Sequence, residues 1–76
     1  MSAVRLLSKR AVNKILREAG LIDSGKKFSG ASGEYEIWVT SWGEPMMVPE
    51  EGPDKRCAEW VLHERLKKVL DTNPEN

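Results

Sequence analysis

Residues 32–52 read SGEYEIWVTSWGEPMMVPEEG and contain the clearest strand pattern in this chain of 76 residues. Across residues 34–42, large side chains alternate between two sets, which is typical of a strand with one buried face. Residues 44–48 follow a turn and are expected to form the return strand. Because proline lacks a backbone N–H, Pro45 and Pro49 place this return strand at an edge of the sheet.

The two sets of side chains lead to a prediction of which sheet face is covered. Trp38 and Trp42 fall in the set that we expect on the face away from the core. That second face is then covered by Phe28 and the loop before it, by a second copy of the chain, or by a partner. The side chain of one phenylalanine is too small to cover the side chains of two tryptophans. The other set is expected to face the core: Tyr35, Ile37 and Val39.

The turn after the first strand decides the pairing of the two strands. A two-residue turn at residues 42–43 pairs Trp38 with Met47, whereas a three-residue turn with Gly43 as a bulge pairs Trp38 with Met46. We favour the three-residue turn, because the two-residue turn would put a tryptophan at positive φ. Either register leaves one methionine on each face.

One helix is predicted before the strands and one after them. The first spans residues 2–19, with Ser2 as its N-cap and Gly20 as the left-handed residue that ends it. The second begins at residues 53–54, where a proline and an aspartate suit the first turn, and ends near residue 70. The expected core stripes are Val4, Leu7, Ala11, Ile15 and Ala19 on the first helix and Ala58, Leu62, Leu66 and Val69 on the second.

These elements predict an α+β fold in which two helices pack on one face of a small antiparallel sheet. The order is helix, two or three strands, helix. Residues 23–33 are expected to be a loop, and residues 26–28 supply the third strand if there is one. The chain is expected to form one domain, residues 1–76, with frayed ends at residues 1–2 and 73–76.

Composition argues against several classes of function. One cysteine, Cys57, and one histidine, His63, allow no disulfide within the chain and supply too few ligands for a zinc site. Six positions apart on one helix, they point about 240° apart and cannot act together as nucleophile and base. Residues 20–27, GLIDSGKK, lack the preceding strand and following helix of a phosphate-binding loop. We therefore expect a non-enzymatic protein without metal, cofactor or small-molecule substrate.

Charge is uneven along the chain although 12 basic and 12 acidic side chains cancel. Residues 1–27 hold seven basic and two acidic residues, a net charge of +5. Residues 28–54 hold six acidic and no basic residues, and residues 55–76 hold five basic and four acidic residues, for net charges of −6 and +1. The overall balance argues against a general polyanion binder. Without an apolar run long enough for a membrane span or signal peptide, we expect a cytoplasmic protein that makes no membrane contact.

Several large apolar side chains lie outside the predicted core. Trp60, for example, lies about 160° from Leu62 around the second helix. Exposed tryptophans are frequent hot spots of interfaces, and a chain this short has a thin core. We expect a small protein–protein interaction module, of the style of phage-like accessory proteins, that self-associates and occupies a surface of a larger partner. Its candidate partner-binding residues are Trp38, Trp42, Met47 and Trp60.

Nucleic-acid binding is the alternative function. The first helix carries five basic residues against one acidic residue, and such a face suits contact with phosphates. Two further basic residues lie at the expected start of the second helix. The candidate nucleic-acid-binding residues are Arg5, Lys9, Arg10, Lys14, Arg17, Lys55 and Arg56.

The order of elements, together with the sequence KRCA at residues 55–58, is similar to the double-stranded-RNA-binding domain, whose last helix opens with Lys-Lys-x-Ala-Lys. The resemblance implies that Lys55 and Arg56 contact phosphates and that the first helix reads the minor groove. Two residues depart from the pattern. Glu59 stands where the family has its last lysine, and Asp54 adds another negative charge.

Overall fold

Two helices and a three-stranded antiparallel sheet make up most of residues 4–75, the residues that the computed structural model describes. A second sheet consists of two short strands. The predicted α+β class is confirmed. The elements are β1 (Leu6–Leu7), α1 (Lys9–Glu18), β2 (Ile22–Gly30), β3 (Gly33–Val39), β4 (Pro45–Glu50), β5 (Cys57–Ala58) and α2 (Glu59–Leu70).

The three-stranded sheet has the strand order β2-β3-β4, so β4 lies at an edge, as its two prolines predicted. Trp38 pairs with Met46, which confirms the favoured register. The backbone N–H of Thr40 donates to the carbonyl of Glu44 at 2.9 Å and closes a three-residue turn. Gly43 ends that turn at a φ of 87°, a conformation that glycine adopts without strain.

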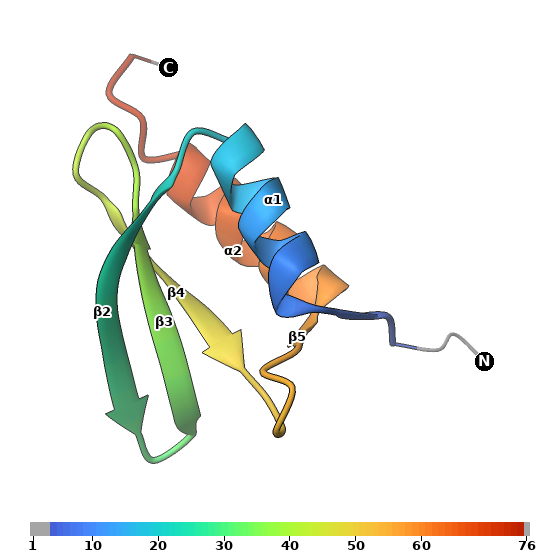
Figure 1. The fold of residues 1–76 in the computed structure, drawn as a ribbon. Helices are drawn as coiled ribbons and strands as arrows, with labels where there is room; N and C mark the ends of the chain where they lie inside the picture. Colours follow the sequence, from blue (N-terminus) through green and yellow to red (C-terminus); the bar gives the residue numbers. More distant parts are fainter. Residues whose placement is uncertain (1–3, 76) are drawn as a thin grey trace.

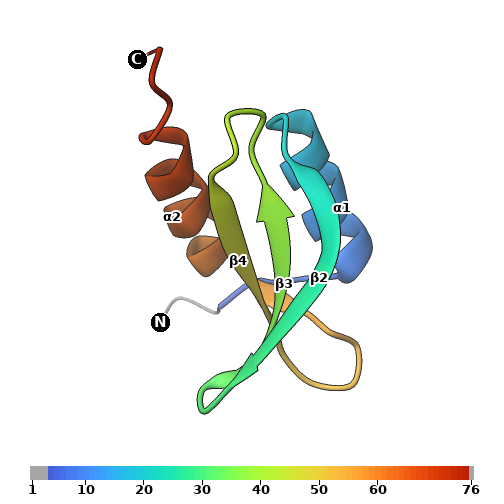
Figure 2. The same cartoon turned by 90° about the vertical axis from the view of Figure 1, so that its left-hand side faces the viewer.

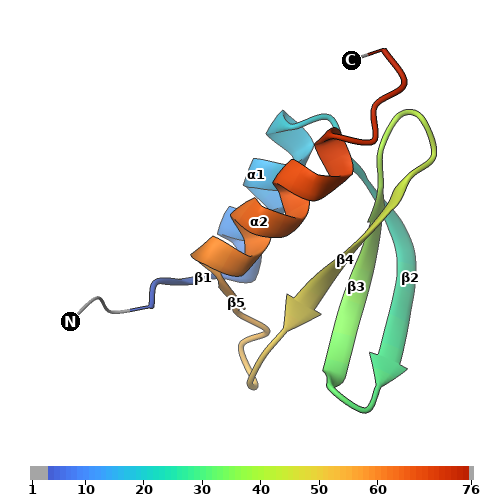
Figure 3. The same cartoon turned by 180° about the vertical axis from the view of Figure 1, so that it is seen from behind.

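The predicted core face of β3 is wrong. Both helices lie on the same side of the three-stranded sheet (Figures 1 and 3), and Trp38 is 0% exposed beneath them. Met46 and Val48 of β4 are buried with it. The second set of β3 side chains, Tyr35, Ile37 and Val39, is only half-buried on the opposite side. Because both sets contain large apolar side chains, alternation alone did not identify the buried one, and the larger indole occupies the covered position.

Helix α1 begins at Lys9, seven residues later than predicted, because the residues before it are extended. Ser8 is the N-cap, and its Oγ accepts a hydrogen bond from the Ala11 N–H at 3.3 Å. The residues before Ser8 include β1, which pairs with β5, and Val4 is 60% exposed instead of lying in the core. Ser2, the predicted N-cap, lies outside the described residues. The helix buries Val12 and Leu16.

The predicted end of this helix is confirmed. Gly20 has a φ of 90°, and its N–H donates to the carbonyl of Arg17 at 3.0 Å. The N–H of Leu21 donates to the carbonyl of Leu16 at 3.0 Å, which completes a Schellman motif. Leu21 is buried, whereas Ile22, the first residue of β2, is 65% exposed.

Helix α2 begins at Glu59, not at residues 53–54. The N–H of Glu51 donates to the carbonyl of Arg56, and the N–H of Arg56 to the carbonyl of Glu51, each at 2.9 Å. These reciprocal bonds close a loop over residues 52–55, in which Lys55 has a φ of 53°. A helix cannot pass through such a loop, so the chain returns as β5 before α2 starts.

Strand β2 is longer than the optional strand at residues 26–28, and most of the predicted loop belongs to it. A bulge interrupts its pairing with β3 between Asp23 and Lys26. Ser24 bridges this bulge, since its Oγ donates to the carbonyl of Ile37 at 2.6 Å and accepts from the Lys26 N–H at 3.1 Å. Glycine and serine are typical of loops, so the sequence predicted a loop here. The hydrogen bonds of Ser24 instead hold the segment in the sheet.

Candidate interaction surfaces

The sheet face opposite the helices, which we call the open face, is almost entirely uncharged. Figure 2 looks onto this face, and the helices lie behind it. Residues paired across antiparallel strands share a face, so the register defines its members. Of the nine paired positions, only Lys26 carries a charge. The three rows are Ile22, Val39 and Pro45; Lys26, Ile37 and Met47; and Phe28, Tyr35 and Pro49.

Two members of the open face are strongly exposed: Ile22 at 65% and Phe28 at 48%. The ring centroids of Phe28 and Tyr35 lie 6.2 Å apart, as in an aromatic cross-strand pair. The guanidinium carbon of Arg65 lies 5.9 Å from the centroid of the Tyr35 ring, so a cation from α2 borders the face beside β4. The open face is therefore an exposed apolar surface with a positive margin.

The predicted partner-binding residues lie in four different environments. Trp38 is fully buried and cannot be a surface anchor, so its assignment to the second face is wrong. Met47 belongs to the open face. Trp42 is half-buried, and its Nε1 donates to Thr72 Oγ1 at 3.0 Å. Trp60 is 60% exposed on α2, as expected, but belongs to a different surface.

The surface around Trp60 is shallow and mixed in character. Trp60 and Val61 border a hollow of about 270 Å³ together with Glu64, Arg65 and Lys68. Lys68 Nζ lies 3.3 Å from Glu64 Oε1, so two of these charges neutralise each other. Arg65 and Lys68 also border a second hollow of about 300 Å³ between α2 and β4. The two hollows therefore share Arg65 and Lys68, and the second also borders Pro45 and Met47 of the open face.

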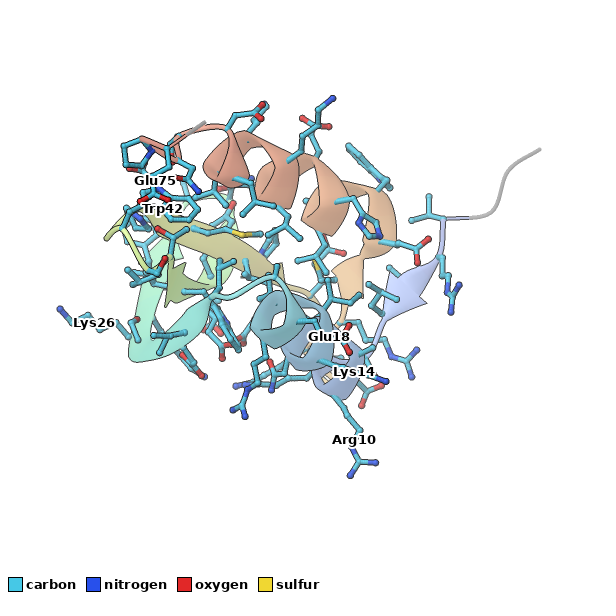
Figure 4. All side chains as sticks on the ribbon, turned by 90° about the horizontal axis from the view of Figure 1, so that it is seen from above. Arg10, Lys14, Glu18, Lys26, Trp42 and Glu75 are labelled. Atoms are coloured by element: carbon cyan, nitrogen blue, oxygen red, sulfur yellow. The ribbon has the colours of Figure 1, made fainter. Side chains whose placement is uncertain are left out.

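The predicted nucleic-acid-binding residues divide into two groups. Four of them have carboxylate neighbours at 3.0–3.9 Å: Arg5 with Glu59, Lys9 with Glu36 and Glu50, Lys55 with Glu50, and Arg56 with Asp54. The other three, Arg10, Lys14 and Arg17, are exposed on one side of α1, and within residues 4–75 none of them has an ion-pair partner. Figure 4 shows Arg10 and Lys14 pointing away from the body of the protein.

The structure also corrects the motif on which the resemblance to the RNA-binding family rests. Lys55 and Arg56 do not open the last helix, because Lys55 is in the loop and Arg56 precedes β5. The N-terminus of α2 has Ala58 as its N-cap and the acidic Glu59 in its first turn. These positions therefore do not present two cations from a helix end to a phosphate backbone.

A buried pair of carboxylates was not foreseen from the sequence. The side chains of Glu36 and Glu50 are 8% and 6% exposed. Lys9 Nζ lies 3.0 Å from Glu36 Oε2 and 3.9 Å from Glu50 Oε1, and Lys55 Nζ lies 3.6 Å from Glu50 Oε2. Trp38 Nε1 donates to Glu36 Oε1 at 2.7 Å. The cluster links the start of α1 to β3, β4 and the loop before β5.

The cluster shifts the proton affinities of its members. Burial works to raise the pKa of Glu36, but hydrogen bonds from Trp38 and Lys9 outweigh it, and the net shift is downward. The side chains of Lys27 and Lys55 meet beside Glu50. The pKa of Lys55 is raised by Lys27 and by the Glu50 carboxylate, and the pKa of Lys27 is lowered mainly by Lys55.

Next to this cluster is a cavity of about 10 Å³, bordered by Asn13, Glu50 and Cys57 among others. Asn13 Oδ1 and both Glu50 carboxylate oxygens are buried and accept no hydrogen bond from residues 4–75. The cavity is close to the size of one water molecule, and a water is the small donor that would serve such acceptors. The site suits a structural role at the junction of α1 and the sheet.

Nucleophilic or metal chemistry finds little support in the described residues. Cys57 is buried, and its pKa is raised by desolvation and by Glu51. Within residues 4–75, no three His, Cys, Asp or Glu side chains are grouped so that they could hold a metal ion. In the same range, no helix is long and apolar enough to cross a membrane.

Comparison with known proteins adds no relative. No protein-family model matches the chain, and neither a curated protein nor a solved structure matches it. Its function must therefore be inferred from the surfaces described above.

Proposed function

We propose that this chain is a small, non-enzymatic protein-interaction module that docks through its open face. The observation that supports this function is the face itself, in which eight of nine paired positions are uncharged. Its members Ile22 and Phe28 are strongly exposed in the single chain. Covering these side chains would add the hydrophobic stabilisation that a thin core lacks, at about 25 cal/mol per Å² of apolar surface removed from water.

The size of the open face sets the strength of the contact. Three strands spaced about 4.8 Å apart, with three rows of side chains, make a surface of about 300 Å². A standard interface buries about 800 Å² on each partner. The open face alone therefore supports weak association. A tight complex would also bury the two hollows beside Arg65 and Trp60. We propose that a second copy of the chain binds the open face of the isolated protein. A larger protein is the proposed physiological partner of the same face.

Light scattering coupled to size-exclusion chromatography tests the second copy. We expect the apparent mass to rise from one chain of 8.6 kDa toward two as concentration increases. Phe28→Lys should abolish the rise, because it places a second cation beside Lys26 on the open face. Lys14→Glu, a charge change on α1, is the matched control and should leave the rise intact.

Binding of a dye specific for exposed apolar surface tests the face independently of self-association. We expect the wild type to bind the dye and Phe28→Lys to bind less. If the wild type stays a single chain at all concentrations, the second copy is excluded. If both proteins also bind the dye equally, the open face is not the docking surface.

Nucleic-acid binding remains a second candidate because Arg10, Lys14 and Arg17 form an exposed stripe without ion-pair partners in residues 4–75. Three phosphate contacts would give a slope of about −2.7 in a plot of log affinity against log salt concentration. Arg10→Glu should remove most of the affinity for duplex RNA or DNA. Lys26→Glu is the control, since Lys26 projects from the sheet, apart from Arg10 and Lys14 on α1 (Figure 4). Absence of binding at low salt would remove this candidate.

A further inference from the structure

Strand β2 leaves one side of the three-stranded sheet open for pairing. It is nine residues long, it ends the order β2-β3-β4, and no other strand of residues 4–75 pairs with its outer side. All of its residues except Ser24 are exposed. A long edge of this kind presents unpaired backbone groups to another extended chain.

The two prolines of β4 make the opposite edge of the sheet unfavourable for pairing with another strand. Val39 pairs with Pro45 and Tyr35 with Pro49. In this register Met46 and Val48, which lie opposite Trp38 and Glu36, exchange the backbone hydrogen bonds with β3. The intervening positions of β4, Pro45, Met47 and Pro49, turn their backbone groups outward. Two of these three cannot donate. Strand addition at β4 would therefore lack most of its donors, and β2 is the favourable edge.

Backbone direction along β2 follows from the bulge. The N–H of Lys26 points toward β3, because it donates to Ser24 Oγ, which donates to the Ile37 carbonyl. Since successive residues of a strand turn their backbone groups to opposite sides, Phe28 also faces β3, whereas Lys27 and Ser29 face outward. The backbone groups of Lys27 and Ser29 therefore offer two hydrogen-bond donors and two acceptors on the outer side of β2.

Two of the three charged side chains of β2 are basic. Lys26 projects to the open face, so a strand beside β2 would meet its ammonium there. Lys27 projects to the other face, where its side chain meets Lys55 beside Glu50. At the start of the strand, Arg17 borders a hollow of about 310 Å³ together with Leu21, Ile22 and Asp23. The carboxylate of Asp23 is engaged, since its Oδ1 accepts from the Gly25 N–H at 2.9 Å.

From these observations we propose that the outer edge of β2 binds an extended acidic segment of a partner protein by strand addition. The outward backbone groups of Lys27 and Ser29 supply the hydrogen bonds, and Lys26 and Arg17 select carboxylate side chains. A second copy of this chain is disfavoured at this edge, because two β2 strands would bring like-charged lysines together. Lys26 belongs to both surfaces, but the outward backbone groups of Lys27 and Ser29 do not belong to the open face. Lys27→Pro therefore tests the edge, and Phe28→Lys tests the open face.

Amide hydrogen exchange with a defined peptide tests the proposal. The probe is an acetylated and amidated seven-residue peptide that alternates glutamate and threonine, and its control has lysine in place of glutamate. With the acidic peptide, exchange of the Lys27 and Ser29 amides should slow, while the already bonded Lys26 and Phe28 amides should not change. The lysine peptide should protect none of them. Equal protection by both peptides, or protection at none of these amides, would overturn the proposal.

Two variants separate the backbone from the charges. Lys27→Pro removes one outward donor without removing a bond of the sheet, and it should abolish protection of Ser29. The double variant Arg17→Glu, Lys26→Glu keeps the donors and should weaken peptide binding about tenfold. If Lys27→Pro unfolds, as circular dichroism would show, the double variant decides. Unchanged peptide binding in the double variant would exclude selection of acidic side chains. If the wild type has the mass of two chains and Lys27→Pro has the mass of one, the edge binds a second copy instead.

Discussion

Trp38 donates a hydrogen bond from its indole Nε1 to Glu36 Oε1 at 2.7 Å, two positions along the same strand. Both side chains face the helices, and Trp38 is completely buried while the Glu36 side chain is 8% exposed. Burying a carboxylate costs stability unless it is paired. Here the indole and the ammonium of Lys9 supply the pairing. The bond therefore explains how an alternating strand can place a charged residue on its covered face.

Replacing Trp38 should cost far more than replacing the exposed tryptophan. Trp38→Phe removes volume from the core and leaves Glu36 Oε1 without its donor, so we expect a loss of about 2 to 3 kcal/mol in the free energy of unfolding. Urea denaturation followed by circular dichroism measures it. Trp60→Phe is the matched control and should change stability by less than about 0.5 kcal/mol. Equal losses in both variants would contradict the buried hydrogen bond.

Acid should destabilise the protein through Glu36. The folded-state pKa of Glu36 lies below its ordinary value of 4.5, so its contribution is fully present above that pH. The contribution is lost as pH falls through the folded pKa, because the protonated form no longer pairs with Lys9. Thermal unfolding between pH 7 and pH 3 measures the loss.

Glu36→Gln is the control for this pH dependence. Its amide keeps an acceptor for Trp38 but cannot pair with the Lys9 ammonium, so we expect a loss of about 1 to 2 kcal/mol at pH 7 after allowance for the exposure of Lys9. Its unfolding temperature should also fall less between pH 5 and pH 3 than that of the wild type. Identical acid sensitivity in the two proteins would assign the effect to other carboxylates.

The end of α1 depends on the backbone conformation of Gly20. No atom beyond its chain neighbours lies within 4 Å of a Cβ added there, so Gly20→Ala introduces no clash. The cost is that of holding alanine at a φ of 90°, and we expect a loss of about 1 to 2 kcal/mol. Gly20→Asn should lose less, because asparagine tolerates this conformation better. Chemical denaturation of both variants checks the order, and an unchanged stability in Gly20→Ala would exclude the Schellman motif.

Cys57 should be unreactive in the folded protein. The thiol is buried, and its raised pKa keeps it protonated near neutral pH. A thiol-specific reagent at pH 8 should therefore label Cys57 slowly in buffer and rapidly in urea. Labelling as fast as that of a free cysteine in buffer would show that the loop before β5 opens readily.

Several local features followed from the sequence because neighbouring residues determine them. Gly20 ended a helix and Gly43 ended a three-residue turn, since each position needs a φ that glycine tolerates. The prolines placed β4 at an edge for a similarly local reason. Helix starts were less predictable. Residues 2–8 and 53–58 suit a first helical turn, but the pairing of β1 with β5 requires extended chain at Leu6–Leu7 and Cys57–Ala58.

By itself, the sequence determined the α+β class, the turn register and the division of β3 side chains into two sets. Only the tertiary structure decided which set is buried, because that depends on which sheet face the helices cover, and both sets are apolar enough to be covered. The same choice placed Trp38 in the core with Glu36 and left Ile37 and Met47 on the open face. Alternation encodes the difference between two faces of a strand, but the distant helices decide which of them meets water.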